Sequence, residues 1–227
     1  MGYLDFQGES PKNLEEKSCC VFVLDTSGSM TGTKIQQLND GLQRFRHEIL
    51  QMPEVRQRLE IAIVTFNSNV QIILKPTLAV SLEIPLLSAN GTTRLVDGVR
   101  EGMNWARGRT KWYDDTGQPR KRPWVILITD GYPDQGQDVR GLKRELQQAE
   151  ENKEMSFLPI GVEATDMNLL RFLSMSNPHL GARKMEGLKF SEFFKWVSEL
   201  MSGVVNASPG KRLIPPKADE WAQGVEI

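Results

Sequence analysis

Short runs of consecutive apolar residues alternate along this chain with segments in which apolar residues recur every three or four positions. The continuous runs predict buried strands, and they lie at 19–24 (CCVFVL), 61–66 (IAIVTF), 70–74 (VQIIL), 124–130 (WVILITD) and 156–162 (SFLPIGV), with a weaker one near 182–186. The periodic segments predict amphipathic helices, and they lie at 35–49, 95–103, 139–149, 166–175 and 190–201.

Strands that alternate with helices indicate a mainly parallel sheet with helices on both faces. One pair differs, because only Asn67-Ser68-Asn69 joins the runs 61–66 and 70–74. So short a connection predicts a hairpin, and hence one antiparallel edge strand. We therefore expect a single doubly wound, Rossmann-like α/β domain. The predicted organisation is an N-terminal extension at 1–18, the domain at 19–205 and an extended C-terminal tail at 206–227.

Two segments combine aromatic and charged residues outside the predicted core. Residues 107–123 are polar and contain Gly and Pro, so they predict a loop, in which Trp112 and Tyr113 stand among basic residues. A solvated loop is the simpler interpretation, and a contact with protein or nucleic acid is the alternative. On the last helix, Trp196 lies beside the apolar stripe. We expect this ring to be half exposed, which would leave it available for docking.

Composition and charge exclude several functional classes. The chain has 227 residues, 25% of them charged, and a net charge of −1, so nothing attracts it as a whole to nucleic acid or to an anionic membrane. No run approaches the roughly 18 apolar residues of a membrane span, and the polar N-terminus does not resemble a secretory signal. Cys19 and Cys20 are adjacent in a predicted strand and point to opposite faces. They predict free thiols in a reducing compartment, and hence a cytoplasmic protein.

Oxygen-bearing side chains follow several of these strands. Asp25, Ser27 and Ser29 come at the end of the first strand, Asp130 ends the fourth, and Thr92 lies in a turn before a helix. In a doubly wound sheet these positions share the edge formed by the carboxyl ends of the strands. Donors that are all oxygen suit a hard cation. The sequence therefore predicts a Mg²⁺ site, with Mn²⁺ or Ca²⁺ as alternatives.

Other chemistries fit this loop less well. Asp25 ends a strand as an aspartyl-phosphate nucleophile would, so a metal-dependent, phosphatase-like enzyme is the alternative function. Such enzymes usually need a second carboxylate close by, and position 27 is serine. The glycine spacing excludes a phosphate-binding P-loop. A Ser–His–Asp hydrolase would need His47 or His179, which we interpret as incidental. For the loop alone, helix capping is a further alternative.

The segment Asp25-Thr26-Ser27-Gly28-Ser29 resembles the D-x-S-x-S loop of von Willebrand factor A (VWA) domains. That loop is part of the metal-ion-dependent adhesion site (MIDAS) of the family. A threonine in a Gly-rich turn and an aspartate that ends a later strand complete the site, and Asn90-Gly91-Thr92 and Asp130 match these in order. The resemblance covers roughly 19–203 and implies a binding module that is not an enzyme.

Carried onto this sequence, the resemblance implies that some residues bind the metal directly and others bind it through water. Ser27, Ser29 and Thr92 would bind the metal through their hydroxyls, and Asp25 and Asp130 through water. Thr93 is an alternative to Thr92 that the sequence leaves open. One coordination position would stay open for an Asp or Glu of a partner protein.

Within the family, the chain is similar to intracellular bacterial proteins of the tellurite-resistance TerY type. The features that carry this similarity are the early first strand, the segment TDGYPD and the closing helix FSEFFKWVSELMS. The similarity implies a cytoplasmic adaptor in a stress, tellurite-resistance or defence system, encoded near a kinase or phosphatase that could be its partner. Neither a membrane nor a nucleic acid is an expected partner.

Overall fold

A computed structural model of the chain describes residues 11–174, 181–207 and 215–222. Six strands form one sheet in the order β3-β2-β1-β4-β5-β6. They are β1 (Ser18–Asp25), β2 (Leu59–Phe66), β3 (Val70–Leu78), β4 (Trp124–Thr129), β5 (Ser156–Val162) and β6 (Arg183–Met185). Every neighbouring pair is parallel except β2 and β3, which are antiparallel. The predicted α/β class, with one antiparallel edge strand, is confirmed.

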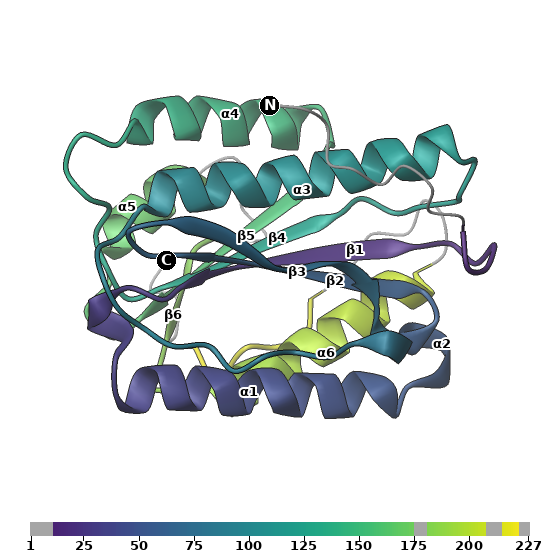
Figure 1. Ribbon diagram of the computed structural model, residues 1–227, viewed down its shortest axis with the longest axis horizontal. Helices are drawn as coiled ribbons and strands as arrows, with labels where there is room; N and C mark the ends of the chain where they lie inside the picture. The colour runs from purple at the N-terminus through teal and green to yellow at the C-terminus, as the bar shows by residue number, and fades with distance from the viewer. Residues whose placement is uncertain (1–10, 175–180, 208–214, 223–227) are drawn as a thin grey trace.

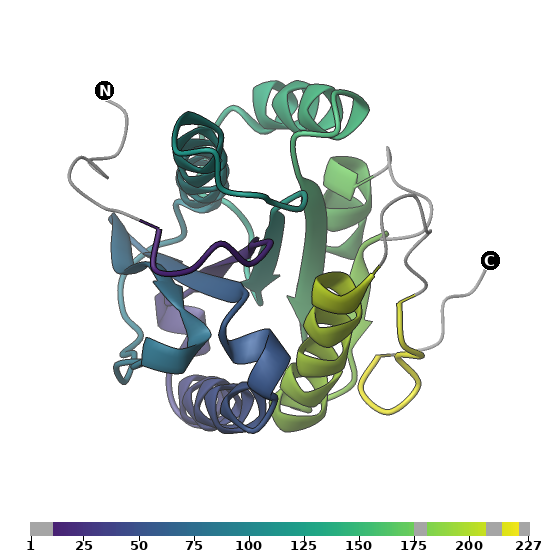
Figure 2. The same cartoon turned by 90° about the vertical axis from the view of Figure 1, so that its right-hand side faces the viewer.

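Helices cover both faces of the sheet (Figures 1 and 2). One face carries α1 (Thr33–Leu50), α2 (Pro53–Arg56) and α6 (Phe190–Asn206). The other carries α3 (Leu95–Asp115), α4 (Val139–Glu151) and α5 (Met167–Ser174). The chain is thus doubly wound, as the alternation of strands and helices predicts.

The central strand β1 is continuously apolar from Cys19 to Leu24 because both of its faces are buried. Cys20 and Phe22 point into the cluster beneath α1 and α6, whereas Cys19 and Val21 point into the cluster beneath α3 and α4. Both cysteines are free, buried thiols, as their adjacent positions predict. Burial raises the pKa of both thiols, so neither is a reactive thiolate.

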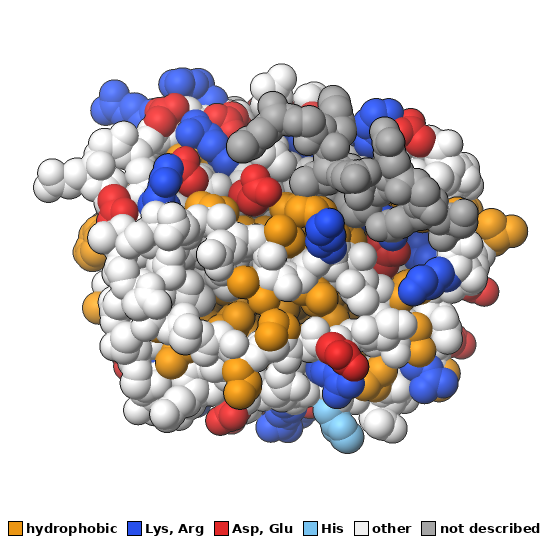
Figure 3. Space-filling view, viewed as in Figure 1, with side chains coloured by type: hydrophobic (Ala, Val, Ile, Leu, Met, Phe, Trp, Pro, Cys, Tyr) orange, Lys and Arg blue, Asp and Glu red, His pale blue; other side chains and the backbone are white. Residues whose placement is uncertain are grey.

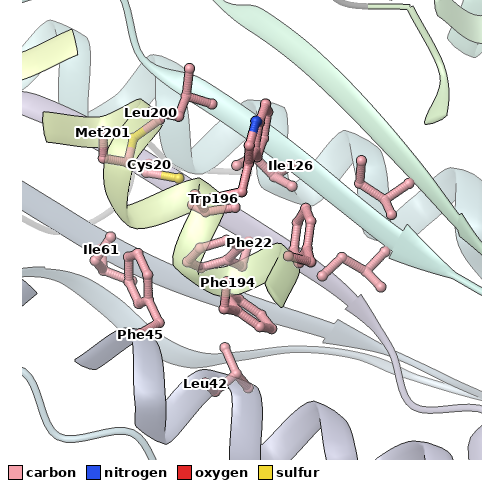
Figure 4. Packing of buried hydrophobic residues seen from close by; sticks show 14 of the residues in the cluster. Cys20, Phe22, Leu42, Phe45, Ile61, Ile126, Phe194, Trp196, Leu200 and Met201 are labelled. Carbon is pink, nitrogen blue, oxygen red and sulfur yellow. The ribbon is translucent and has the colours of Figure 1, made fainter. Parts of the chain in front are cut away.

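Aromatic rings fix how α1 and α6 pack on the sheet (Figure 4). The ring centroid of Phe22 lies 5.4 Å from that of Phe45 on α1 and 5.6 Å from that of Phe194 on α6, both edge to face. Gly41 lets the two helices approach, since a Cβ there would stand 2.6 Å from the Phe194 ring. These contacts pack α1 and α6 against β1 and against each other.

The prediction of a loop at 107–123 is wrong for its first half, because α3 continues to Asp115. Arg109, Trp112 and Tyr113 return to the buried side of this helix and are only 5%, 9% and 1% exposed. The helical pattern was not recognised because this stretch contains Gly108 and several charged residues. Arg109 in particular was not expected on the buried face, since arginine is rarely a core residue. A contact with protein or nucleic acid through these aromatic rings is excluded by their burial.

Two expectations for the C-terminal part are also wrong. Trp196 is 3% exposed rather than half exposed, because Trp221 covers it with a centroid distance of 5.2 Å. The described part of the tail is not simply extended, since 215–222 folds back onto α6 and β6. The Trp196 indole Nε1 donates to the Pro216 carbonyl at 2.8 Å. Trp196 is therefore not a free docking residue.

One face of the molecule mixes charges of both signs. Acidic and basic side chains are interspersed on the face shown in Figure 3, around a central band of hydrophobic side chains. Within the described ranges, no helix combines the length and apolarity that a bilayer crossing requires.

Candidate metal site

The candidate site lies where the winding of the sheet reverses. β1 pairs with β2 on one side and with β4 on the other, so the winding reverses between β1 and β4, where doubly wound folds bind their ligands beyond the carboxyl ends of the strands. Leu24 is in register with Ile128. Asp25, one residue further along β1, and Asp130, two residues beyond Ile128, therefore reach the same edge from neighbouring strands.

Asp25 forms the floor of the site. Its side chain is fully buried, with Oδ1 accepting from the Ser27 amide at 2.8 Å and Oδ2 from the Thr129 hydroxyl at 2.5 Å. Burial raises the pKa of this carboxyl to about 6, and the hydrogen bonds from Ser27 and Thr129 offset only part of that rise. A cation nearby would favour the ionised form and lower the pKa again.

Ser27 and Ser29 join this floor to Asp130. The hydroxyls of Ser27 and Ser29 lie 3.0 Å apart, and that of Ser29 donates to Oδ1 of Asp130 at 2.6 Å. Octahedral Mg²⁺, with ligands at about 2.0–2.1 Å, needs adjacent ligand oxygens about 2.9 Å apart. The observed serine pair meets this requirement. Ser27 is buried and Ser29 is exposed, so the pair opens to solvent on the Ser29 side.

The structure separates the two candidate threonines. The Thr92 hydroxyl lies on an exposed turn, 3.4 Å from that of Ser68. Thr93 is 9% exposed and faces inward. A Cβ on Gly131 would stand 3.6 Å from the Thr93 hydroxyl and equally far from Oδ2 of Asp25. The Thr93 side chain and the Asp25 carboxylate therefore both lie next to Gly131, whereas the Thr92 hydroxyl lies next to Ser68.

Close contacts join the loop after β1, the turn at 90–93 and the β2–β3 connection. The Gly28 amide donates to the Gly91 carbonyl at 3.0 Å, and the Asn90 amide donates to the Thr26 carbonyl at 2.9 Å. Gly91 has a φ of 76°, and a Cβ there would stand 2.4 Å from the Ser68 hydroxyl. Only glycine suits both the conformation and the space.

Asp134 fixes the orientation of Thr93. Its side chain accepts from the Thr93 amide at 3.0 Å, and its own amide donates to the Thr93 carbonyl at 3.0 Å. Asp134 ends the segment TDGYPD but was not predicted as a site residue. Its only signal was its position in the short loop after Asp130.

Lys34 and Glu163 are further residues that the sequence analysis missed. The Lys34 ammonium lies 2.5 Å from Oδ2 of Asp130 and 2.9 Å from a carboxylate oxygen of Glu163. Glu163 directly follows β5 and has a φ of 48°, which is unusual for a residue other than glycine. Asp25, Asp130 and Glu163, when ionised, carry three negative charges against the single positive charge of Lys34. A divalent cation would balance the remainder.

This donor set fits a hard cation and not a soft one. Among the residues that the structure describes, no three His, Cys, Asp or Glu side chains form a metal-binding group, so hydroxyls must contribute to any metal site here. A hydrolase triad is not supported. His47 lies in the last turn of α1, about 21 Å along the helix from its first residue, Thr33. His179 lies outside the described residues.

Comparison with known proteins agrees with the fold. The von Willebrand factor type A domain model matches residues 20–185, which include every candidate ligand. A curated relative, inter-alpha-trypsin inhibitor heavy chain H1 of Mesocricetus auratus, is 28% identical over 179 residues. The match covers 74% of this chain but only 19% of the relative.

Solved structures share the fold at low sequence identity. The pilus adhesin SpaC of Lactobacillus rhamnosus GG, in its open conformation, aligns with a TM-score of 0.67 and 14% identity over 87% of this chain and 31% of that one. The vWF domain of the type V pili tip protein Mfa5 of Porphyromonas gingivalis aligns with a TM-score of 0.60 and 11% identity, over 88% of this chain and 99% of that one.

Proposed function

The chain belongs to the von Willebrand factor type A domain family, and from this premise we propose that it is a metal-dependent protein-interaction module. Domains of this family are general modules for protein interaction and adhesion. The main support for a metal-dependent function is the position of the Ser29 hydroxyl. It lies 3.0 Å from the Ser27 hydroxyl and 2.6 Å from Oδ1 of Asp130. This chain of oxygens joins the loop after β1 to the end of β4.

The proposed ligands of a Mg²⁺ ion are the hydroxyls of Ser27, Ser29 and Thr93, with Asp25 and Asp130 acting through water. Mn²⁺ or Ca²⁺ are alternatives. We propose Thr93 in place of Thr92 because its side chain faces inward and lies, like the Asp25 carboxylate, next to Gly131. A cation held mainly by neutral hydroxyls keeps most of its positive charge, so it would attract a further carboxylate.

That further carboxylate is proposed to come from an Asp or Glu of a partner protein. The exposed side of the serine pair gives it access, and a charge-assisted contact would make binding depend strongly on the metal. The alternative, phosphoryl transfer through Asp25, receives less support. Both oxygens of this carboxylate accept hydrogen bonds and the side chain is fully buried, so it is poorly placed for attack on a substrate.

The cellular setting follows only from the resemblance to TerY-type proteins. It comprises a cytoplasmic adaptor in a bacterial stress, tellurite-resistance or defence system, with a kinase or phosphatase as partner. Pilus proteins with the same fold show that the fold itself does not fix the compartment.

The proton relaxation of water in the presence of Mn²⁺ tests the proposal directly. Bound Mn²⁺ should enhance relaxation because it tumbles slowly with the protein while some of its coordinated water still exchanges with bulk. Acetate or a glutamate-containing peptide should reduce the enhancement by replacing that water, whereas the matching glutamine peptide should not. The Ser27→Ala/Ser29→Ala double variant should lose the enhancement, and Ser198→Ala, a buried serine on α6, should keep it. Enhancement that survives in the double variant would refute the site.

A further inference from the structure

A cavity of about 340 Å³ opens at the end of the sheet opposite the candidate metal site. Its walls come from the chain before β1, the start of β2, the end of β3 and the C-terminal half of α3. β1 begins directly after Lys17, which lines this cavity, and ends at Asp25, so the two sites lie at opposite ends of one strand and share no residue. The volume is at the lower end of the range for small-molecule sites.

Lys17 is a buried cation in the wall of this cavity. It is 2% exposed, and its ammonium donates to the Glu15 carbonyl at 2.9 Å and to the Asn13 side-chain oxygen. Both partners are neutral, and within the described part of the chain no carboxylate lies in ion-pair range of this ammonium. Burial lowers the pKa of Lys17, and the more distant Glu60 carboxylate offsets only part of that effect. A buried charge of this kind is expected to have a counter-ion.

Glu60 forms no direct ion pair with Lys17, because its oxygens are engaged by other groups. Arg109 donates to Glu60 through Nε at 2.6 Å and through a terminal nitrogen at 2.8 Å, and the Tyr113 hydroxyl donates to it at 2.6 Å. The charges of Arg109 and Glu60 therefore cancel. What remains in the cavity wall is the positive charge of Lys17 and of Lys12.

Gln118 adds a hydrogen-bond acceptor to the same wall. The residue is 3% exposed, and its amide nitrogen donates to the Glu15 carbonyl at 2.7 Å. This bond fixes which end of the amide is the oxygen. That oxygen is buried, and no donor among the described residues reaches it. A ligand that donates here would satisfy a group that is otherwise costly to bury.

We propose that this cavity binds a small organic anion whose carboxylate or phosphate lies between Lys17 and Lys12. The anion carries a hydroxyl or amino group that donates to the Gln118 side-chain oxygen. The Trp112 ring supplies an apolar wall for the carbon skeleton. This inference does not depend on the metal site.

The test is a titration of the ¹⁵N-labelled full chain, followed by NMR, at constant ionic strength. The probes are lactate, propionate and glycerol 3-phosphate. Lactate or glycerol 3-phosphate should cause saturable shifts of the Trp112 indole signal and of the Lys17 and Gln118 amides, and the tighter of the two identifies the anion class. Propionate, which lacks the hydroxyl of lactate, should bind at least about fivefold more weakly than lactate. Absence of saturable shifts with both hydroxyl-bearing probes would overturn the proposal.

Variants separate a specific site from general attraction of anions. Lys17→Gln should weaken binding at least about tenfold, and Gln118→Leu should abolish the difference between lactate and propionate. Lys75→Gln removes an exposed lysine of β3 that lies outside the cavity wall, so it should change nothing. If Lys17→Gln does not fold, Lys12→Gln serves in its place. Lys12 is exposed, so this variant should fold and should weaken binding less than Lys17→Gln would. Equal losses in the Lys12 and Lys75 variants would show unspecific attraction and refute the site.

Discussion

The ammonium of Lys34 lies 2.5 Å from one oxygen of Asp130, and the Ser29 hydroxyl lies 2.6 Å from the other. One oxygen of this carboxylate thus contacts a lysine of the chain itself, and the other contacts the serine pair proposed to hold a metal. Glu163 holds Lys34 from a second side at 2.9 Å. Lys34 is therefore positioned to oppose a divalent cation through charge repulsion.

We expect Lys34→Met to bind Mg²⁺ at least about threefold more tightly than the unaltered chain, because a positive charge close to the cation is removed. Calorimetric titration measures the change, and Lys75→Met serves as a control for the lost charge. Weaker binding in Lys34→Met would mean that orientation of Asp130 by this lysine outweighs repulsion.

The stability of the metal-free protein should depend on pH through Asp25. Its pKa is about 6 in the folded chain, against about 3.8 for an ordinary aspartate, so the folded state binds more protons between these values. The free energy of unfolding should therefore fall as pH rises from about 4 to about 6, by at most about 3 kcal/mol. Urea unfolding of the chain and of Asp25→Asn isolates this effect, because other groups contribute equally to both. A constant difference between the two across this range would contradict it.

Mg²⁺ binding should show the opposite dependence on pH. A proton on Asp25 competes with the cation, so affinity should decrease up to about tenfold per pH unit below about 6 and level off above it. Calorimetric titrations at several pH values measure the slope. An affinity that does not change across pH 6 would show that Asp25 takes no part in holding the metal.

The sequence predicts the fold where burial is local and misses it where burial depends on a distant partner. Strands such as β1 are continuously apolar, so their place in the sheet could be predicted directly. The end of α3 was missed because Arg109 is buried only by virtue of Glu60, a residue 49 positions away in the chain. The packing of Trp221 on α6 was missed for the same reason, since the residues around Trp221 in the sequence do not show that it contacts this helix.

In the candidate site, too, local sequence predicts some residues, whereas others depend on contacts between distant segments. Asp25, Ser27, Ser29 and Asp130 could be found because each lies in a strand end or the loop after it. The choice between Thr92 and Thr93 could not be made from sequence. Adjacent residues of a turn point in different directions, and here the direction depends on contacts across loops.

The buried ion pair gives a prediction of stability. Arg109→Met should destabilise the protein by roughly 3–5 kcal/mol, because it leaves Glu60 buried without its cation. Arg107→Met is the matched control, since its ion pair with Glu154 is partly exposed and should contribute about 0–1 kcal/mol. Urea unfolding measures both. The double variant Arg109→Met/Glu60→Gln should regain part of the loss, and failure to regain any would indicate that packing around Arg109 dominates.

The returning tail gives a second prediction of stability. Trp221 is 1% exposed, and its ring contacts those of Phe193 and Trp196 at centroid distances of 4.9 and 5.2 Å. Trp221→Ala should therefore reduce the free energy of unfolding by roughly 3–5 kcal/mol. Tyr132→Ala, at a side chain that is 63% exposed, should change it by no more than about 0.5 kcal/mol. Equal small effects would show that 215–222 adds little to stability.

The two threonines of the 90–93 turn allow the sharpest test of the ligand assignment. Thr93→Val removes the buried hydroxyl next to Gly131 but keeps the shape and the backbone bonds to Asp134. We expect it to weaken Mg²⁺ binding at least about tenfold, since one ligand of the cation is lost. Thr93→Ser, which keeps a hydroxyl, should retain most of the affinity. Thr92→Val removes a hydroxyl that lies beside Ser68 and should have less than about a twofold effect. Calorimetry on the three variants, with circular dichroism to confirm folding, decides the matter. If Thr92→Val is the variant that loses the metal, the turn must rearrange when the cation binds, and Thr92 is the ligand.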